Sequence, residues 1–184
     1  MRVARNEAER QALWKGRKGA FSAMGRLSSD FYVMDGVVPR TKLPDTLARI
    51  DAISARTGYR ICNVFHAGDG NLHPLVLFDA FKPGQYEAVL RIGDEILKLC
   101  ADAGGSVTGE HGIGLEKREN IRYVFSDDDL EVMDRIRRVF DPHRLMNPGK
   151  VFPSDGLAPS AHETLPGYPR RQAAAIGAGD DLWV

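Results

Sequence analysis

Residues 59–79 read YRICNVFHAGDGNLHPLVLFD. Apolar and polar residues alternate as far as His66, four turn-forming residues follow at 67–70, and an apolar run then resumes. Two such runs joined by a short glycine-containing loop are typical of a β-hairpin. We therefore expect antiparallel strands over residues 59–66 and 71–79, joined by a tight turn.

Apolar periodicity on either side of this hairpin predicts helices and further short strands. The expected elements are helices over 4–26, 44–57, 84–103 and 127–140 and strands over 30–38 and 106–108. This order of elements predicts an α+β fold, an antiparallel sheet with helices on one face. Residues 154–184 are rich in Pro, Gly, Ala and Ser and have no apolar period, so we expect one domain over 1–153 followed by a flexible tail.

Composition narrows the class of protein. The 184 residues include 25 Lys and Arg and 25 Asp and Glu, and this net charge of zero argues against a protein that coats nucleic acid or anionic membrane. No apolar run approaches the ~18 residues that span a bilayer, and the N-terminus does not resemble a signal peptide. Two cysteines cannot form a dense disulfide framework. A cytoplasmic protein is the expectation.

Two histidines flank the hairpin turn, His66 and His73. Residues facing each other beside such a turn lie about 4.5–5.5 Å apart, so two imidazoles could reach one metal ion at ~2.0–2.1 Å. The glycines between them allow the chain to turn tightly. The alternative is a polar hairpin tip that carries two exposed histidines.

A second glycine-rich turn, Gly-Glu-His-Gly-Ile-Gly at 109–114, carries Glu110 and His111. Glu110 could complete a His-His-Glu metal site with an open position, and His111 could then move a proton at neutral pH. The alternative is a turn with a solvated Glu-His pair, whereas the glycine spacing is wrong for a dinucleotide site. If both turns lie on one side of the sheet, they form one site. His143 and His162 are expected to be surface residues.

Arg17 and the segment 140–150 are the remaining candidates. The guanidinium of Arg17 offers two parallel donors that suit a carboxylate, although on a helix rich in basic residues a solvated face is the alternative. The segment FDPHRLMNPGK at 140–150 is typical of a helix end followed by a compact turn.

Five motifs in order resemble the C-terminal domain of FAD-linked oxidases that act on 2-hydroxy acids. The resemblance is strongest to the bacterial glycolate oxidase branch, and D-lactate and D-2-hydroxyglutarate dehydrogenases are similar. The motifs are LWKGRKGAFSAMGR (13–26), FYVMDGVVPR (31–40), NVFHAGDGNLHPLVLFD (63–79), GEHGIGLEK (109–117) and FDPHRLMNPGK (140–150).

The resemblance implies a ferredoxin-like domain and a set of residue roles. His66, His73 and Glu110 would hold a divalent metal, usually zinc in the related dehydrogenases, and His111 would be the base that takes the hydroxyl proton while a hydride passes to FAD. Arg17 would bind the substrate carboxylate, and Asn147 would contact the cofactor. A Thr and a Lys expected in the hydroxyglutarate branch are not matched near Phe21 and Val33, which argues against a dicarboxylate substrate.

The resemblance also implies partners. Family members carry an N-terminal FAD-binding domain that this chain lacks, so FAD would be held mainly by a missing domain or a partner subunit. An iron-sulfur subunit is the expected electron acceptor, and such partners could place the protein peripherally at the inner membrane. Two other functions remain open. The chain could be a non-catalytic fragment that binds metal or a partner, or it could be a zinc hydrolase. The sequence near the site shows no further nucleophile or oxyanion feature, which argues against a hydrolase.

Overall fold

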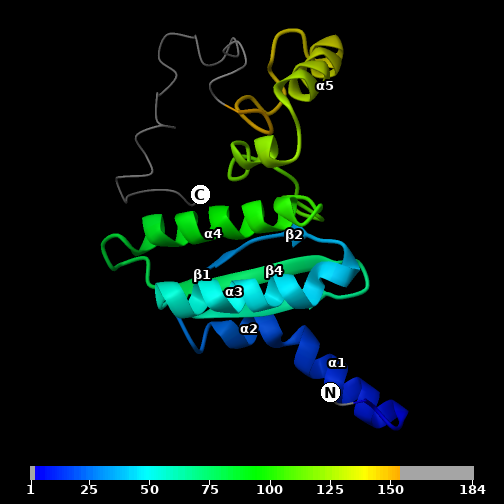
Figure 1. Cartoon of the computed structure of the whole chain (residues 1–184), viewed down its shortest axis with the longest axis vertical. Coiled ribbons are helices and arrows are strands. Elements are labelled where there is room, and N and C mark those ends of the chain that lie inside the picture. Colours follow the sequence, from blue (N-terminus) through cyan, green and yellow to red (C-terminus); the bar gives the residue numbers. More distant parts are fainter. Residues whose placement is uncertain (1–2, 154–184) are drawn as a thin grey trace. The chain divides into compact units, whose positions relative to one another are not determined.

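A computed structural model describes residues 3–153 and divides the chain into two compact units, Met1–Gly112 and Ile113–Val184. The predicted tail over 154–184 lies outside the described residues. Figure 1 shows the elements of each unit. The first unit contains α1 (Glu7–Lys18), α2 (Ala20–Met24), β1 (Asp30–Val33), β2 (Gly36–Val37), α3 (Leu43–Thr57), β3 (Ile61–His66), β4 (Asn71–Phe78) and α4 (Gln85–Asp102). The second contains α5 (Asp127–Phe140).

Strand β4 lies at the centre of an antiparallel sheet, and all eight of its residues are buried. It pairs with β3 through the predicted hairpin and with both β1 and β2. The pairs Val33–Leu75 and Gly36–Leu72 share one register offset, so β1 and β2 run along the same edge of β4 as one interrupted strand. That offset places Asp35, at the interruption, opposite His73.

Helix α4 packs on β1, β2 and β4, and α3 packs on α4 and β3 (Figure 1). The approach of α4 is close: a Cβ on Gly93 would lie 2.6 Å from the Tyr32 ring. The short α2 covers part of the opposite face, where Ala20 and Met24 pack on Leu75 and its neighbours. The predicted α+β fold with an antiparallel sheet is confirmed, and α2 adds a helix on the second face.

Three of the predicted elements differ in detail. The helix expected over 4–26 is divided at Gly19, which caps the end of α1 through its own N–H. The strand expected over 30–38 is interrupted at Met34 and Asp35. The strand expected over 106–108 is reduced to a single bridge between Val37 and Ser106.

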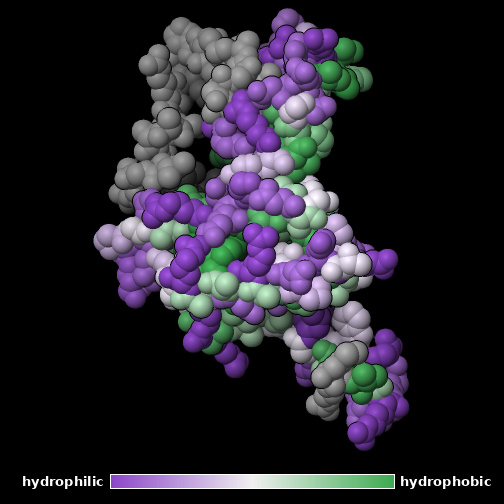
Figure 2. All heavy atoms as spheres, viewed as in Figure 1, coloured by the Kyte–Doolittle hydropathy of each residue, from purple (hydrophilic) through white to green (hydrophobic). Residues whose placement is uncertain are grey.

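The second unit has its own small core of Ile121, Leu130 and Phe152. Helix α5 begins with a capping box in which Ser126 and Asp129 satisfy each other's backbone N–H. Some of its exposed residues are apolar, and Figure 2 shows hydrophobic atoms at one edge of this helix beside hydrophilic ones. The exposed apolar residues of α5 are Val132, Ile136, Val139 and Phe140.

Candidate functional site

The hairpin brings His66 and His73 onto the same face of the sheet. His66 pairs with Asn71 and His73 pairs with Val64. The two histidines are therefore diagonal neighbours, whereas the sequence predicted that they lie directly opposite each other. Their ring centroids nevertheless lie 5.5 Å apart, with the planes at 85°. The His73 side chain is only 5% exposed and that of His66 is 44% exposed, so the pair leads from the interior to the surface.

The glycine-rich turn after α4 approaches this same face. Ser106 and Val37 exchange backbone hydrogen bonds of 2.9 Å, which fixes the start of the turn against the sheet. At Gly109 the contact is so close that a Cβ would lie 2.7 Å from Val37 Cγ2 and 2.9 Å from Asn71 Cγ. Glycine is therefore needed at 109 for the turn to reach the sheet, which carries Glu110 and His111 to the two histidines.

Glu110 and His111 complete a compact cluster. The two carboxylate oxygens of Glu110 lie 3.5 Å from Nε2 of His66 and 3.8 Å from Nε2 of His73. The ring of His111 stacks on that of His73 at 5.2 Å between centroids and 20° between planes. The structure thus brings together the four residues that the sequence singled out in two separate turns. We call His66, His73, Glu110 and His111 the His/Glu cluster.

Asp35 is a fifth member of this site that the sequence reasoning missed. Its carboxylate is fully buried and accepts hydrogen bonds from the Thr108 hydroxyl at 2.7 Å and from the backbone N–H of Gly109, Glu110 and His111 at 3.0, 3.1 and 2.9 Å. Its other oxygen, Oδ1, lies 3.5 Å from Nε2 of His73. An Asp within the apolar run FYVMDGVV was the available sequence signal.

The electrostatics of the site favour an ionised Asp35 and a neutral His73. Burial raises the pKa of the Asp35 carboxyl, but the hydrogen bonds from His111, Thr108, Glu110 and Gly109 outweigh burial and hold the pKa below its ordinary value. Burial also lowers the pKa of the His73 imidazole. The carboxylates of Asp35 and Glu110 oppose this effect without overcoming it, and the neighbouring His111 and His66 add to it.

The site contains nitrogen and carboxylate donors of the kind that bind divalent metals. Among the described residues, Nε2 of His73 is a buried atom without a hydrogen-bond partner, as are both amide atoms of Asn71. Two ligand atoms of a tetrahedral ion at ~2.0–2.1 Å are about 3.3 Å apart, close to the spacing of Glu110 from the two imidazoles. Those two spacings involve different oxygens of Glu110. Among the described residues, the one set of three whose single ligand atoms all lie within 4.8 Å of one another is Asp35, His73 and His111, which shares only His73 with the predicted ligands.

The other two candidate residues lie on α1 and in the second unit. Arg17 is half-buried on α1, where its carbonyl accepts a hydrogen bond from the N–H of Gly19. Within residues 3–153 its side chain makes no hydrogen bond or ion pair. The helix that follows it carries Phe21, whose ring lies 6.4 Å from that of His73. Asn147 belongs to the second unit, where it has a left-handed backbone conformation (φ 46°) and its carbonyl accepts a hydrogen bond from Arg137. Their expected roles stay predictions.

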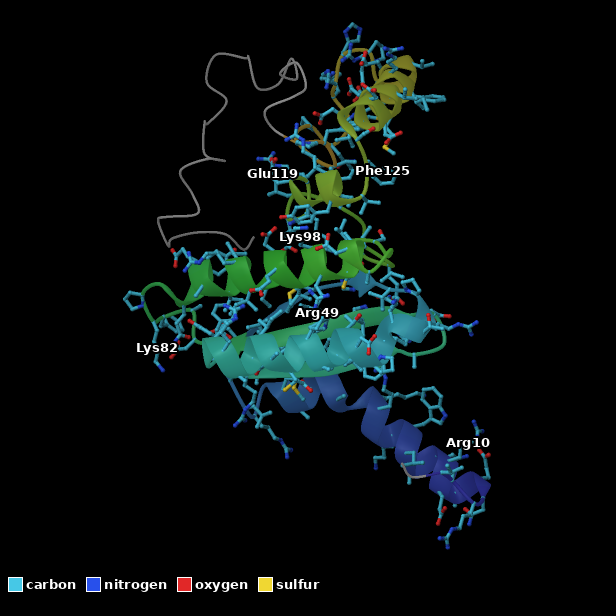
Figure 3. The ribbon with its side chains drawn as sticks, viewed as in Figure 1. Arg10, Arg49, Lys82, Lys98, Glu119 and Phe125 are labelled. Carbon is cyan, nitrogen blue, oxygen red and sulfur yellow. The ribbon has the colours of Figure 1, made fainter. Side chains whose placement is uncertain are left out.

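A groove lies between α3 and α4. Arg49 and Lys98, labelled in Figure 3, are among its lining residues. Its charged side chains largely neutralise one another, because Arg56 pairs with Glu95 at 2.6 Å and Lys98 with Asp102 at 2.8 Å.

Within residues 3–153, no helix is both long enough and apolar enough to cross a bilayer.

Comparison with known proteins places the chain in a family. Residues 1–151 match the family model described as FAD linked oxidases, C-terminal domain. The chain is 48% identical to glycolate oxidase subunit GlcD of Escherichia coli over 84% of its own length and 31% of the relative's, and 34% identical to that of Bacillus subtilis over 84% and 33%. It is 30% identical to the mitochondrial D-lactate dehydrogenase [cytochrome] of Kluyveromyces lactis, over 87% of this chain and 28% of the relative.

The chain therefore spans about a third of the length of these curated relatives. The family match covers both the hairpin and the glycine-rich turn that build the His/Glu cluster. The chain belongs to the FAD-linked oxidases, and it represents their C-terminal domain.

Proposed function

We propose that this chain is the substrate-binding part of a flavin-dependent 2-hydroxy-acid oxidoreductase, with glycolate as the first candidate substrate and glyoxylate as its product. The observation that carries the proposal is the His/Glu cluster, in which a buried imidazole, an exposed imidazole and a carboxylate converge beside a second, stacked imidazole. The 48% identity to the Escherichia coli glycolate oxidase subunit favours glycolate over D-lactate, because two D-lactate dehydrogenase relatives are 30% and 36% identical.

His66, His73 and Glu110 are the residues that would hold a divalent metal, with zinc as the first candidate. They fit it because Nε2 of His73 is buried without a partner and because nitrogen and carboxylate donors together suit zinc. When bound, such an ion polarises the substrate and lowers the pKa of its hydroxyl. In this assignment Asp35 is not a metal ligand, and its carboxylate keeps the hydrogen bonds that it accepts from the backbone N–H groups of Gly109 and His111.

His111 is the proposed base. Its side chain is exposed and stacks on His73, so a substrate hydroxyl can reach it from solvent. A neutral imidazole there accepts the hydroxyl proton as the C–H bond of the substrate breaks. Arg17 is the proposed partner of the substrate carboxylate, which a guanidinium binds through two parallel hydrogen bonds.

FAD supplies the hydride acceptor in this family. The described residues form one antiparallel sheet and contain no parallel strand–helix–strand unit of the kind that holds a dinucleotide. We therefore propose that a FAD-binding domain or subunit outside residues 3–153 holds the flavin, with Asn147 as a contact. An iron-sulfur subunit is the proposed electron acceptor, and a cytoplasmic location with peripheral attachment to the inner membrane is proposed with it.

Metal titration of the full chain tests the site. We expect about one Co²⁺ or Zn²⁺ per chain, lost in His66→Ala and in Glu110→Ala because each removes one ligand. His143→Ala removes an exposed histidine from a turn of the second unit and is the matched control. Undiminished metal in both site variants would contradict the assignment.

Activity is tested by adding the candidate FAD-binding partner and supplying glycolate or D-lactate with a dye acceptor. His111→Asn should lower kcat by about 10²–10⁴-fold, as expected for loss of a general base, and keep the bound metal. A failure to oxidise any 2-hydroxy acid would favour the alternative of a non-catalytic fragment that binds metal or a partner.

A further inference from the structure

Asp35 has a place in the site that the proposed roles do not use. Its side chain is 0% exposed, on the strand edge beside β4, and its neighbours in sequence, Met34 and Gly36, are buried too. Burying a carboxylate is costly unless hydrogen bonds replace its lost hydration. The replacement comes from one short stretch of chain, residues 108–111, which also carries Glu110 and His111.

The hydrogen bonds to Asp35 fix a particular backbone shape. Three successive N–H groups, of Gly109, Glu110 and His111, converge on Oδ2 at 2.9–3.1 Å, which is the arrangement of a backbone nest around an anion. The Thr108 hydroxyl donates to the same oxygen at 2.7 Å and accepts from the N–H of Gly112 at 2.9 Å. Hydrogen bonds therefore hold the turn in place both before and after Glu110 and His111.

We propose that Asp35 is a positioning residue, whose buried carboxylate holds the backbone of residues 109–111 so that Glu110 and His111 meet His66 and His73. Fixing three consecutive N–H groups fixes the directions in which the side chains of 110 and 111 leave the chain. The second oxygen of Asp35 lies 3.5 Å from Nε2 of His73, so the same carboxylate also lies beside the buried imidazole. One carboxylate thus organises residues from both turns.

Two features separate this role from that of a metal ligand. Oδ2 already receives four hydrogen bonds, and Oδ1 receives one from Glu110 at 3.2 Å. A metal on Asp35 would compete with donors that hold Glu110 and His111 in place. The proximity of Asp35, His73 and His111 within 4.8 Å follows equally from an anchor beneath the site.

The test compares Asp35→Asn and Thr108→Val with Asp134→Asn, a fully buried carboxylate of the second unit held by Arg138 and Arg144. Two quantities are measured in the full chain: hydrogen exchange of the amides of residues 109–111, and Co²⁺ affinity with its visible absorption band. The exchange readout needs no metal, whereas the affinity readout rests on the proposed function.

In Asp35→Asn we expect exchange at residues 109–111 to accelerate about tenfold or more and Co²⁺ affinity to fall about 10–100-fold, the usual effect of losing a residue that orients ligands. The absorption band should keep its position, because the ligands are unchanged. Thr108→Val, which spares the carboxylate, should shift both quantities in the same direction by a smaller factor, and Asp134→Asn should shift neither.

Exchange that stays within about twofold of wild type in both site variants would overturn the proposal. So would a shifted cobalt band in Asp35→Asn together with unchanged affinity in Thr108→Val, since that result makes Asp35 a ligand. If Asp35→Asn does not fold, Thr108→Val decides alone. A wild-type chain that binds no Co²⁺ contradicts the proposed metal site, while the exchange measurement still decides the role of Asp35.

Discussion

At the scale of single residues, the site depends on a few buried polar groups in an otherwise apolar sheet. His73 and Asp35 are both at most 4% exposed as whole residues. They lie opposite each other, with His73 on β4 and Asp35 at the interruption between β1 and β2. Neither was recognised as buried from local sequence. His73 stood out because a second histidine lies near it, whereas the hydrogen-bond partners of Asp35 lie between 73 and 76 residues further along the chain.

Burial of His73 should make stability dependent on pH. The pKa of its imidazole in the folded protein lies below the ordinary value, first because of burial. The unfolded chain therefore binds more protons near neutrality, so stability is greatest above about pH 6.5 and declines as the pH falls through the lowered folded pKa. Urea unfolding between about pH 8 and pH 5 should show this decline.

The variant His73→Asn should have a shallower decline than wild type, since it lacks the titrating group. His143→Asn, an exposed histidine in a turn, is the control and should keep the wild-type slope. An unchanged slope in His73→Asn would show that other groups determine the pH dependence.

At the scale of elements, local signals predicted the structure where contacts are local. The hairpin was found because its turn of four residues brings neighbouring runs together, and α5 was found because Ser126 and Asp129 cap its start. The interruption between β1 and β2 is not predicted by local sequence, because Asp35, which lies there, contacts residues of the turn after α4. A strand propensity cannot report a partner so distant in sequence.

Close packing of α4 on the sheet gives an opposed pair of predictions. Gly16→Ala should stabilise the protein by up to about 1 kcal/mol, because the site is open and alanine favours a helix. Gly93→Ala, also within a helix, should destabilise it by about 1–3 kcal/mol, because the new Cβ meets the Tyr32 ring. Urea unfolding of the two variants measures both effects.

The sign of the difference is the decisive quantity. Helix propensity alone makes both substitutions favourable, so a stabilised Gly93→Ala would show that α4 does not approach β1 as described. Equal effects at the two positions would exclude the close contact for the same reason.

At the scale of the whole molecule, the chain has two units, each with its own core. No sequence pattern indicates a boundary near residue 112, because the glycine-rich turn resembles any other loop. The whole His/Glu cluster and Asp35 lie within Met1–Gly112, so the proposed metal site needs no residue of the second unit. The balanced charge of the chain is consistent with a small anionic substrate bound by a local cluster.

Metal binding should accordingly slow hydrogen exchange in the first unit only. With Zn²⁺ at about 100 times its dissociation constant, opening of the site should cost about 2.7 kcal/mol more, so amides of β3 and β4 should exchange more slowly. Amides of α5 should exchange as before. Hydrogen exchange with and without Zn²⁺ measures this, and His66→Ala should abolish the difference. Equal protection of α5 would show that the two units open together.

The central position of β4 has a consequence for how the protein is made. Strands β1, β2 and β3 each pair with β4, and within residues 3–153 no ladder joins any two of those three. Strands β1, β2 and β3 therefore stay unpaired until residues 71–78 have been synthesised. Over that interval this sheet cannot form, and its apolar strands need protection from other chains. Completion of the sheet is thus timed by translation of a single segment, which also delivers His73.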